Sequence, residues 1–109
     1  MTDCIFCKIL RREIPSIFVY EDELVAVIPD IHPKAPVHLL VLTREHRASL
    51  DEMEPTDESL LGHALMVGRS VAQQKGLPAF RVVINTGAEA GQSVFHFHIH
   101  ILGGEKLKE

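Results

Sequence analysis

The sequence predicts one α+β domain, residues 1–109, in which an antiparallel sheet of about five strands packs with one long and one short helix. Short apolar segments follow one another with only a few turn residues between them, and strands connected in this way pair antiparallel. One long segment, from about residue 56 to 75, instead repeats its apolar residues at helical spacing. A chain of 109 residues has room for one hydrophobic core and not for two.

The N-terminal half is expected to hold the short helix and three strands. The helix covers about residues 4–11, where Asp3 can cap it and Pro15 lies beyond its end. The strands are expected at 17–20, 24–28 and 37–42. The third strand is apolar throughout apart from His38, which predicts burial on both of its faces.

The C-terminal half is expected to hold the long helix and two further strands. The helix begins at Thr56 or Asp57, with acidic residues in its first turn, and Gly76 followed by Pro78 ends it. Its inward stripe is expected to comprise Leu60, Leu61, Ala64, Leu65, Val71 and Ala72. The two strands are expected at 80–85 and 94–102.

The last of these strands carries a histidine at every second position. Side chains alternate between the two faces of a strand, so one face receives the imidazoles of His96, His98 and His100. The other face receives Phe95, Phe97, Ile99 and Ile101. A helix would mix the two sets around its circumference. The spacing therefore predicts a strand with one apolar face and one imidazole face.

Charge and composition exclude several classes of protein. The net charge of −4, the isoelectric point near 5.9 and the scattered basic residues predict no nucleic-acid partner. The N-terminus does not resemble a signal peptide and no apolar run reaches membrane-spanning length, so we expect a cytoplasmic protein without a membrane partner. Cysteines in that compartment stay reduced, which makes Cys4 and Cys7 a metal or redox pair.

Three interpretations of the imidazole face compete: a polar solvent face, a metal site and a catalytic row. A single metal ion cannot easily bind all three imidazoles, because the first and third lie roughly 13 Å apart along a strand. A catalytic row would place neutral and protonated imidazoles against a charged group. The chain has no phosphate-binding loop with a G-x-x-x-x-G-K-[ST] pattern, so imidazoles, hydroxyls and backbone N–H groups would have to meet a phosphate.

The segment 91–104, GQSVFHFHIHILGG, resembles the His-x-His-x-His signature of the histidine triad (HIT) family of nucleotide-binding hydrolases and transferases. The residues just before and after the three histidines also resemble those of the Hint branch of this family, the purine nucleoside phosphoramidases. The resemblance begins at Ile5-Phe6, continues through several short motifs to Asn85, and covers nearly the whole chain. It implies a HIT-like fold.

The resemblance also implies a mechanism. His98 would attack the α-phosphorus of a purine nucleoside phosphoramidate (AMP- or GMP-type), and water would hydrolyse the nucleotidyl-histidine formed. Attack needs a neutral imidazole with one nitrogen free, and a hydrogen bond from the other nitrogen to a carbonyl would fix that tautomer. By resemblance, His96 and His100 contact the phosphate, His38 supports them, and Ser93 hydrogen-bonds the leaving group.

A nucleoside pocket is implied by the same resemblance. Asp30 matches the acceptor for the ribose hydroxyls, with a simple turn residue as the alternative. Gln92 and Asn85 match contacts to phosphate or ribose. The positions that enclose the base are Ile5, Phe6, Ile9, Ile28 and Ile31. For Ile9 and Ile28 an ordinary place in the core is an equal alternative.

The two cysteines resemble the N-terminus of zinc-bearing HIT proteins. That resemblance implies a structural zinc ion held by Cys4, Cys7, His46 and His96, with no catalytic metal; the alternative is that both thiols pack as small apolar groups. The resemblance also implies a homodimer, formed through the long helix and the strand at 80–85. The competing functions are hydrolysis of dinucleoside polyphosphates, nucleotide sensing without turnover, and a zinc-held interaction protein.

Overall fold

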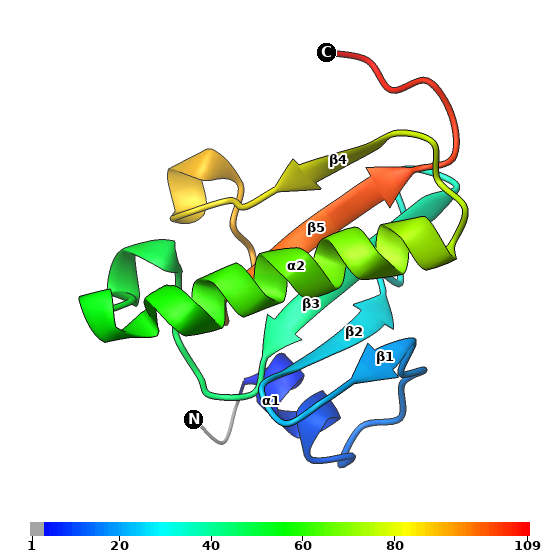
Figure 1. The fold of residues 1–109 in the computed structure, drawn as a ribbon. Helices are drawn as coiled ribbons and strands as arrows, with labels where there is room; N and C mark the ends of the chain where they lie inside the picture. The colour runs from blue at the N-terminus through cyan, green and yellow to red at the C-terminus, as the bar shows by residue number, and fades with distance from the viewer. Residues whose placement is uncertain (1–3) are drawn as a thin grey trace.

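The computed structural model describes residues 4–109 and contains a five-stranded antiparallel sheet in the order β1-β2-β3-β5-β4 (Figure 1). The strands are β1 (Tyr20–Glu21), β2 (Val25–Pro29), β3 (Val37–Thr43), β4 (Phe80–Val83) and β5 (His98–Gly103). The helices are α1 (Ile5–Leu10) and α2 (Glu58–Gln74). The predicted fold class is confirmed. None of the helices described is both long and apolar enough to cross a membrane.

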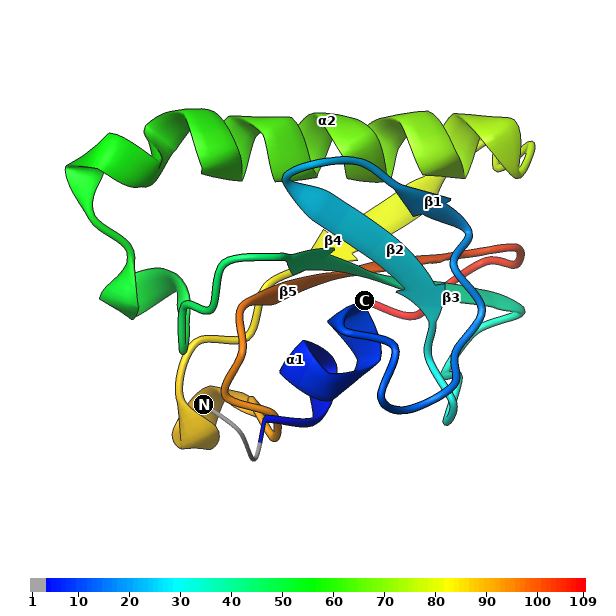
Figure 2. The same cartoon turned by 90° about the horizontal axis from the view of Figure 1, so that it is seen from below.

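The two helices cover opposite faces of the sheet (Figure 2). Alternate residues of β2 and β3 point to the two sides, and both sets are apolar and buried. The α2 side of the core contains Val25, Val27, Leu39, Val41, Phe97, Ile99 and Ile101 with Ala64, Val67, Val71 and Ala72. The α1 side contains Phe6, Ile9, Leu10, Ala26, Ile28, Leu40 and Leu42. Burial of β3 on both faces is as predicted.

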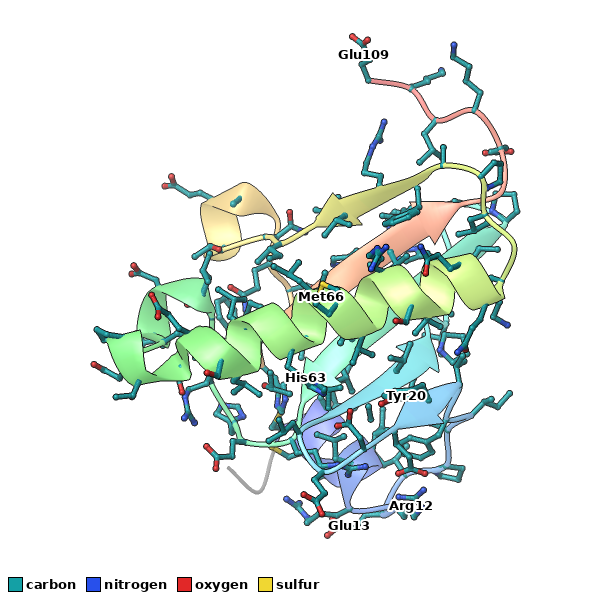
Figure 3. The ribbon with its side chains drawn as sticks, viewed as in Figure 1. Arg12, Glu13, Tyr20, His63, Met66 and Glu109 are labelled. Atoms are coloured by element: carbon teal, nitrogen blue, oxygen red, sulfur yellow. The ribbon has the colours of Figure 1, made fainter. Side chains whose placement is uncertain are left out.

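Helix α2 begins after a 3-10 turn at Pro55–Asp57 and ends just before Gly76, whose φ of 74° only glycine adopts easily. The predicted inward stripe is only partly correct. Leu65 is 39% exposed, whereas Val67 and Gly68 face the sheet. The helix is also tied to β1, because His63 and Tyr20, both labelled in Figure 3, hydrogen-bond Asp22 at 2.7 and 2.8 Å.

Helix α1 matches the predicted range, about residues 4–11, to within one residue at each end. It ends at Leu10, well before Pro15, because the backbone turns at Arg12 with a φ of 62°. The cap at its start is Cys4, whose Sγ accepts a hydrogen bond from the backbone N–H of Cys7 at 3.3 Å; the expected cap, Asp3, lies outside the described residues. The face that α1 turns to the sheet contains Phe6, Ile9 and Leu10, whereas Ile5 is 44% exposed.

The histidine strand begins four residues later than predicted. Residues 94–97 are not part of β5, and the backbone N–H of Phe97 donates to the carbonyl of Arg47 at 2.6 Å. Phe95, which strict alternation would bury, is 50% exposed. The first histidine therefore takes its position from the segment that follows β3 and not from the sheet register.

Candidate active site

The strand register gathers histidines on the α1 side of the sheet. In the β3–β5 ladder, His38 is opposite Leu102, and His100 is opposite Leu40. Directly opposed residues share a face of the sheet, so His38, His98 and His100 point to the same side. Phe6 of α1 packs edge-on against His98, with ring centroids 5.1 Å apart.

A cavity of about 710 Å³ opens on this face of the sheet. Most of the residues predicted to contact substrate line it: Ile5, Phe6, Ile9, Ile28, Asp30, Ile31, His38, Asn85, Ser93, His98 and His100. Sequence reasoning missed others, among them Lys34, Leu40, Arg81, Val83 and Leu102. Leu40 and Leu102 could have been found from the period-two pattern of their strands, since each lies two residues from a histidine that faces the cavity.

The tautomer of His98 is fixed by a backbone carbonyl. Its Nδ1 lies 2.7 Å from the carbonyl oxygen of His96, which can only accept, so Nδ1 carries the proton and donates. In the neutral ring the other nitrogen, Nε2, therefore has a free lone pair. An imidazole held in this form can act as a nucleophile.

The tautomers of His38 and His100 follow from a backbone N–H group. The N–H of Lys34 donates to Nδ1 of His38 at 3.0 Å, so the proton of His38 is on Nε2. That nitrogen lies 2.9 Å from Nδ1 of His100 and donates to it, which leaves His100 with its proton on Nε2. Burial lowers the pKa of His38 and lowers that of His100 to about 4, so both rings are neutral at pH 7.

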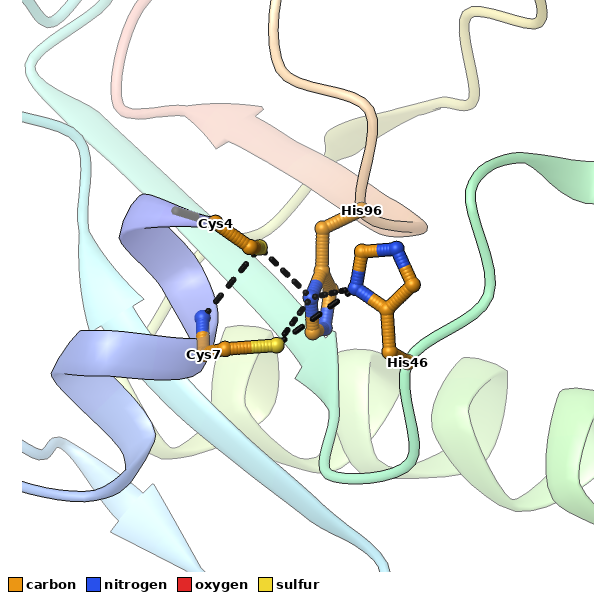
Figure 4. A group of neighbouring side chains, drawn as sticks. All are labelled: Cys4, Cys7, His46 and His96. Atoms are coloured by element: carbon orange, nitrogen blue, oxygen red, sulfur yellow. Dashed lines mark hydrogen bonds between the residues drawn. The ribbon is translucent and has the colours of Figure 1, made fainter. Parts of the chain in front are cut away.

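Cys4, Cys7, His46 and His96 form a compact cluster beside this cavity (Figure 4). The two Nδ1 atoms of His46 and His96 lie 3.2 Å apart. The sulfur-to-nitrogen distances are 3.3 Å from Cys4 to His96, 3.4 Å from Cys7 to His46 and 3.6 Å from Cys7 to His96. Helix α1, the segment after β3 and the segment before β5 thus meet at one point.

The cluster fits a tetrahedral metal ion. Metal bonds of about 2.3 Å to sulfur and about 2.0 Å to nitrogen would space such ligands roughly 3.3 to 3.7 Å apart, close to the distances found. The ring of His96 is oriented for this purpose, because its Nε2 donates to the carbonyl of Thr43 at 2.7 Å and leaves Nδ1 free to bind. Burial lowers the pKa of His96 to about 4, which keeps it in the neutral form that a ligand needs.

Two predicted substrate contacts do not reach the cavity. His96 is fully buried, and its ring nitrogens face the cysteine cluster and Thr43, so no nitrogen is left to contact a phosphate. Gln92 is 4% exposed and folds inward, where its amide accepts from the N–H of Gly87 and donates to the carbonyls of Ala48 and Val94. Gln92 therefore braces the loop that carries Ser93.

The fold and the site together define a class of protein: a small α+β protein that presents neutral imidazoles of fixed tautomer to a ligand-sized cavity. The family model described as "Scavenger mRNA decapping enzyme C-term binding" matches residues 3–108. A HIT-like protein of Synechocystis sp. is 50% identical over 103 residues, which cover 94% of this chain and 90% of that protein.

Solved structures agree with these sequence matches. A histidine triad protein from Clostridium difficile superposes with a TM-score of 0.96 at 42% identity, covering 100% of this chain and 96% of that one. A HIT family hydrolase from Legionella pneumophila gives 0.95 at 38% identity, covering 97% and 96%. This chain belongs to the histidine triad family and has the fold of its hydrolases and nucleotide-binding proteins.

Proposed function

We propose that this protein hydrolyses the phosphorus–nitrogen bond of purine nucleoside 5′-phosphoramidates through a nucleotidyl-histidine intermediate on His98. One observation carries the proposal: the His96 carbonyl binds Nδ1–H of His98, and the free Nε2 belongs to a ring that lines the cavity. In the first step Nε2 bonds to the α-phosphorus, and the phosphorus–nitrogen bond of the substrate breaks. The departing nitrogen takes a proton from solvent and leaves as an amine, and we assign the hydroxyl of Ser93 to hydrogen-bond it.

In the second step water attacks the same phosphorus and gives up a proton to solvent. The bond to His98 breaks, its electron pair returns to Nε2, and the nucleoside 5′-monophosphate is released. Both steps build negative charge on the phosphate oxygens. His100, with its proton on Nε2, is the neutral donor that we assign to those oxygens, and His38 holds it in that tautomer. His96 acts through its backbone carbonyl and is a positioning residue.

The nucleoside is assigned to the part of the cavity next to α1. Asp30 is the acceptor for the ribose hydroxyls, and a carboxylate can accept from both at once. Asn85 also lines the cavity and can hydrogen-bond the phosphate or the ribose. The apolar side chains assigned to the purine are Ile5, Phe6, Ile9, Ile28 and Ile31, all of which line the same cavity.

We further propose that the ion in the cysteine–histidine cluster is zinc, because two thiolates and two imidazoles in a tetrahedral arrangement are a donor set that zinc favours. Its role would be structural, holding Cys4 and Cys7 of the α1 end against His46 and His96. In the cytoplasm, where we expect the protein to reside, both thiols stay reduced and available as ligands.

A homodimer is the expected assembly. Strand β4 lies at an edge of the sheet, and Phe80 and Val82 on it are 37% and 43% exposed. Leu65 and Met66 on α2 are also exposed (Figure 3 labels Met66). An unpaired apolar edge beside exposed helix residues favours pairing with a second copy. Light scattering is expected to give the mass of two chains, and the mass of one chain would contradict this.

The test is to mix the protein with adenosine 5′-phosphoramidate and follow release of AMP, with His98→Ala as the control. Turnover by the wild type and its loss in His98→Ala are expected. Diadenosine triphosphate is assayed in parallel to test the alternative hydrolase activity. Faster cleavage of that substrate would show that the enzyme is a dinucleoside polyphosphate hydrolase. If AMP raises the melting temperature but no substrate is cleaved, the protein is a nucleotide sensor and the proposal is wrong.

A further inference from the structure

We propose that Asp30 has a second role: its carboxylate positions the His38–His100 pair, so that nucleoside binding and the orientation of the phosphate-binding imidazole are coupled. This inference rests on the proposed function, in which Asp30 serves the ribose. It adds a contact between the carboxylate of Asp30 and the imidazole of His38.

The carboxylate of Asp30 is held in place by the protein itself. The residue directly follows β2, and its backbone N–H donates to the carbonyl of His38 at 2.9 Å. One side-chain oxygen, Oδ1, accepts the N–H of His32 at 2.8 Å. The other, Oδ2, lies 3.4 Å from Nε2 of His38, whose side chain is 1% exposed. The carboxylate of Asp30 therefore lies within reach of a buried imidazole.

The three side chains share a proton and do not form a cation site. Asp30, His38 and His100 bring their ligand atoms within 4.8 Å of one another, which would suit a metal ion. A metal would need a lone pair on Nε2 of His38. The N–H of Lys34 already uses the lone pair on Nδ1, so Nε2 carries the ring proton.

That proton has two acceptors, Nδ1 of His100 at 2.9 Å and Oδ2 of Asp30 at 3.4 Å. The rings of His38 and His100 are tilted by 46° to each other. The negative charge of Asp30 attracts the N–H of His38 and so helps to fix the orientation of its ring. The ammonium of Lys34 opposes positive charge on both rings, and His98 opposes it on His100. Removing the carboxylate would leave the His38 ring held by the N–H of Lys34 and by His100. The orientation of the His100 N–H that faces the substrate would then be less tightly fixed.

A pair of substrates separates the two roles of Asp30. Adenosine 5′-phosphoramidate has both ribose hydroxyls, and 2′,3′-dideoxyadenosine 5′-phosphoramidate has neither. The variant is Asp30→Asn, which has nearly the same shape and keeps an oxygen for the N–H of His32. If Asp30 served the ribose alone, the variant would cleave the dideoxy substrate as fast as the wild type does. A positioning role predicts that kcat for the dideoxy substrate falls about tenfold.

A double-mutant cycle shows whether the effect of Asp30 on kcat passes through His38. In a His38→Gln background, Asp30→Asn is expected to cause no further loss of kcat on the dideoxy substrate, because contacting residues on one path are not additive. An undiminished tenfold loss in that background would overturn the coupling, as would an unchanged kcat in the single variant. Melting temperatures of the variants identify any that fold poorly.

Failure of the proposed function would look different, because the wild type would then cleave neither substrate. In that case the imidazole N–H resonances of ¹⁵N-labelled protein decide the inference. The proposal predicts that Asp30→Asn shifts the Nε2–H signal of His38 and speeds its exchange with water. Unchanged signals would overturn it.

Discussion

At the scale of single residues, the chemistry of this site depends on which ring nitrogen of each histidine carries the proton. Backbone groups decide this: the carbonyl of His96 for His98, the carbonyl of Thr43 for His96, and the N–H of Lys34 for His38. The two-residue spacing was enough to predict that His98 and His100 share a face. It could not predict the tautomers, since every residue type has the same backbone groups and only the folded chain brings them to the rings.

Nitrogen NMR of the imidazoles tests these tautomers. Long-range ¹H–¹⁵N correlations at pH 7 are expected to show the proton on Nδ1 of His98 and on Nε2 of His38, His96 and His100. The metal-bound state of His96 keeps the same proton, because Nδ1 is the nitrogen that faces the cluster. A signal for His98 in the Nε2–H form would remove the lone pair on which the proposed attack depends.

Asp22 is a residue whose charge stabilises the fold. Burial alone would raise its pKa, but hydrogen bonds from the N–H groups of Val25 and Leu24 and from His63 and Tyr20 outweigh this and hold the pKa well below its usual range. A carboxyl group with a depressed pKa adds stability above its unfolded pKa, near 3.9, and this stability is lost as the pH falls.

Asp22→Asn is therefore expected to lower the free energy of unfolding by about 1–3 kcal/mol at pH 7. The difference from the wild type should shrink as the pH falls below about 5, because Asp22 then takes up a proton in the unfolded chain while it stays charged in the folded protein, which favours unfolding of the wild type. Urea unfolding at a series of pH values measures this, with the exposed neighbour Glu23→Gln as the control. A difference that stays constant down to pH 3 would show that packing, and not charge, is responsible.

At the scale of elements, helix α1 forms one side of the cavity. Its residues Phe6 and Ile9 line the cavity, and Cys7 in the same helix belongs to the cysteine–histidine cluster. The sequence predicted both features, but it placed the first histidine within the strand. The hydrogen bond from Phe97 to Arg47 takes that part of the chain out of the ladder, and a pairing so distant in sequence leaves no local pattern.

Metal removal is expected to loosen α1 in particular, since a helix of six residues is too short to be stable alone. Chelation should speed amide exchange in residues 5–11 and lower the melting temperature by at least about 4 °C, while the amides of α2 stay protected. Cys7→Ser should reproduce this effect, and chelator should not change the variant further. Equal exchange with and without chelator would show that the cluster holds no structural metal.

Two glycines in α2 make a matched pair. A Cβ on Gly62 would meet nothing within 4 Å, whereas one on Gly68 would lie 2.9 Å from Cδ1 of Ile101 in the buried face. Gly62→Ala is expected to raise the free energy of unfolding by about 0.5–1 kcal/mol through helix propensity. Gly68→Ala should not raise the free energy of unfolding, because the side chain of Ile101 would have to move within a packed core. Equal shifts in thermal unfolding would mean that α2 does not pack on β5 as closely as described.

At the scale of the whole molecule, the strand order joins distant segments into one site. Placing β5 between β3 and β4 brings His38 beside His100 and Asn85 near the same cavity. The order of elements along the chain and the α+β class could be predicted, because period-two and helical patterns are local. Most cavity residues could be predicted from the resemblance to the histidine triad family. The inward turn of Gln92 and the contact between Asp30 and His38 could not, since both depend on loops whose course only the assembled sheet determines.

The most direct measurement is to mix the protein with adenosine 5′-phosphoramidate, stop the reaction within milliseconds and search for a nucleotidyl adduct by mass spectrometry. The expected result is one adenylyl group per chain, found on the peptide that contains His98 and missing in His98→Ala. AMP release without any adduct, or an adduct at another residue, would contradict the proposal that His98 is the nucleophile.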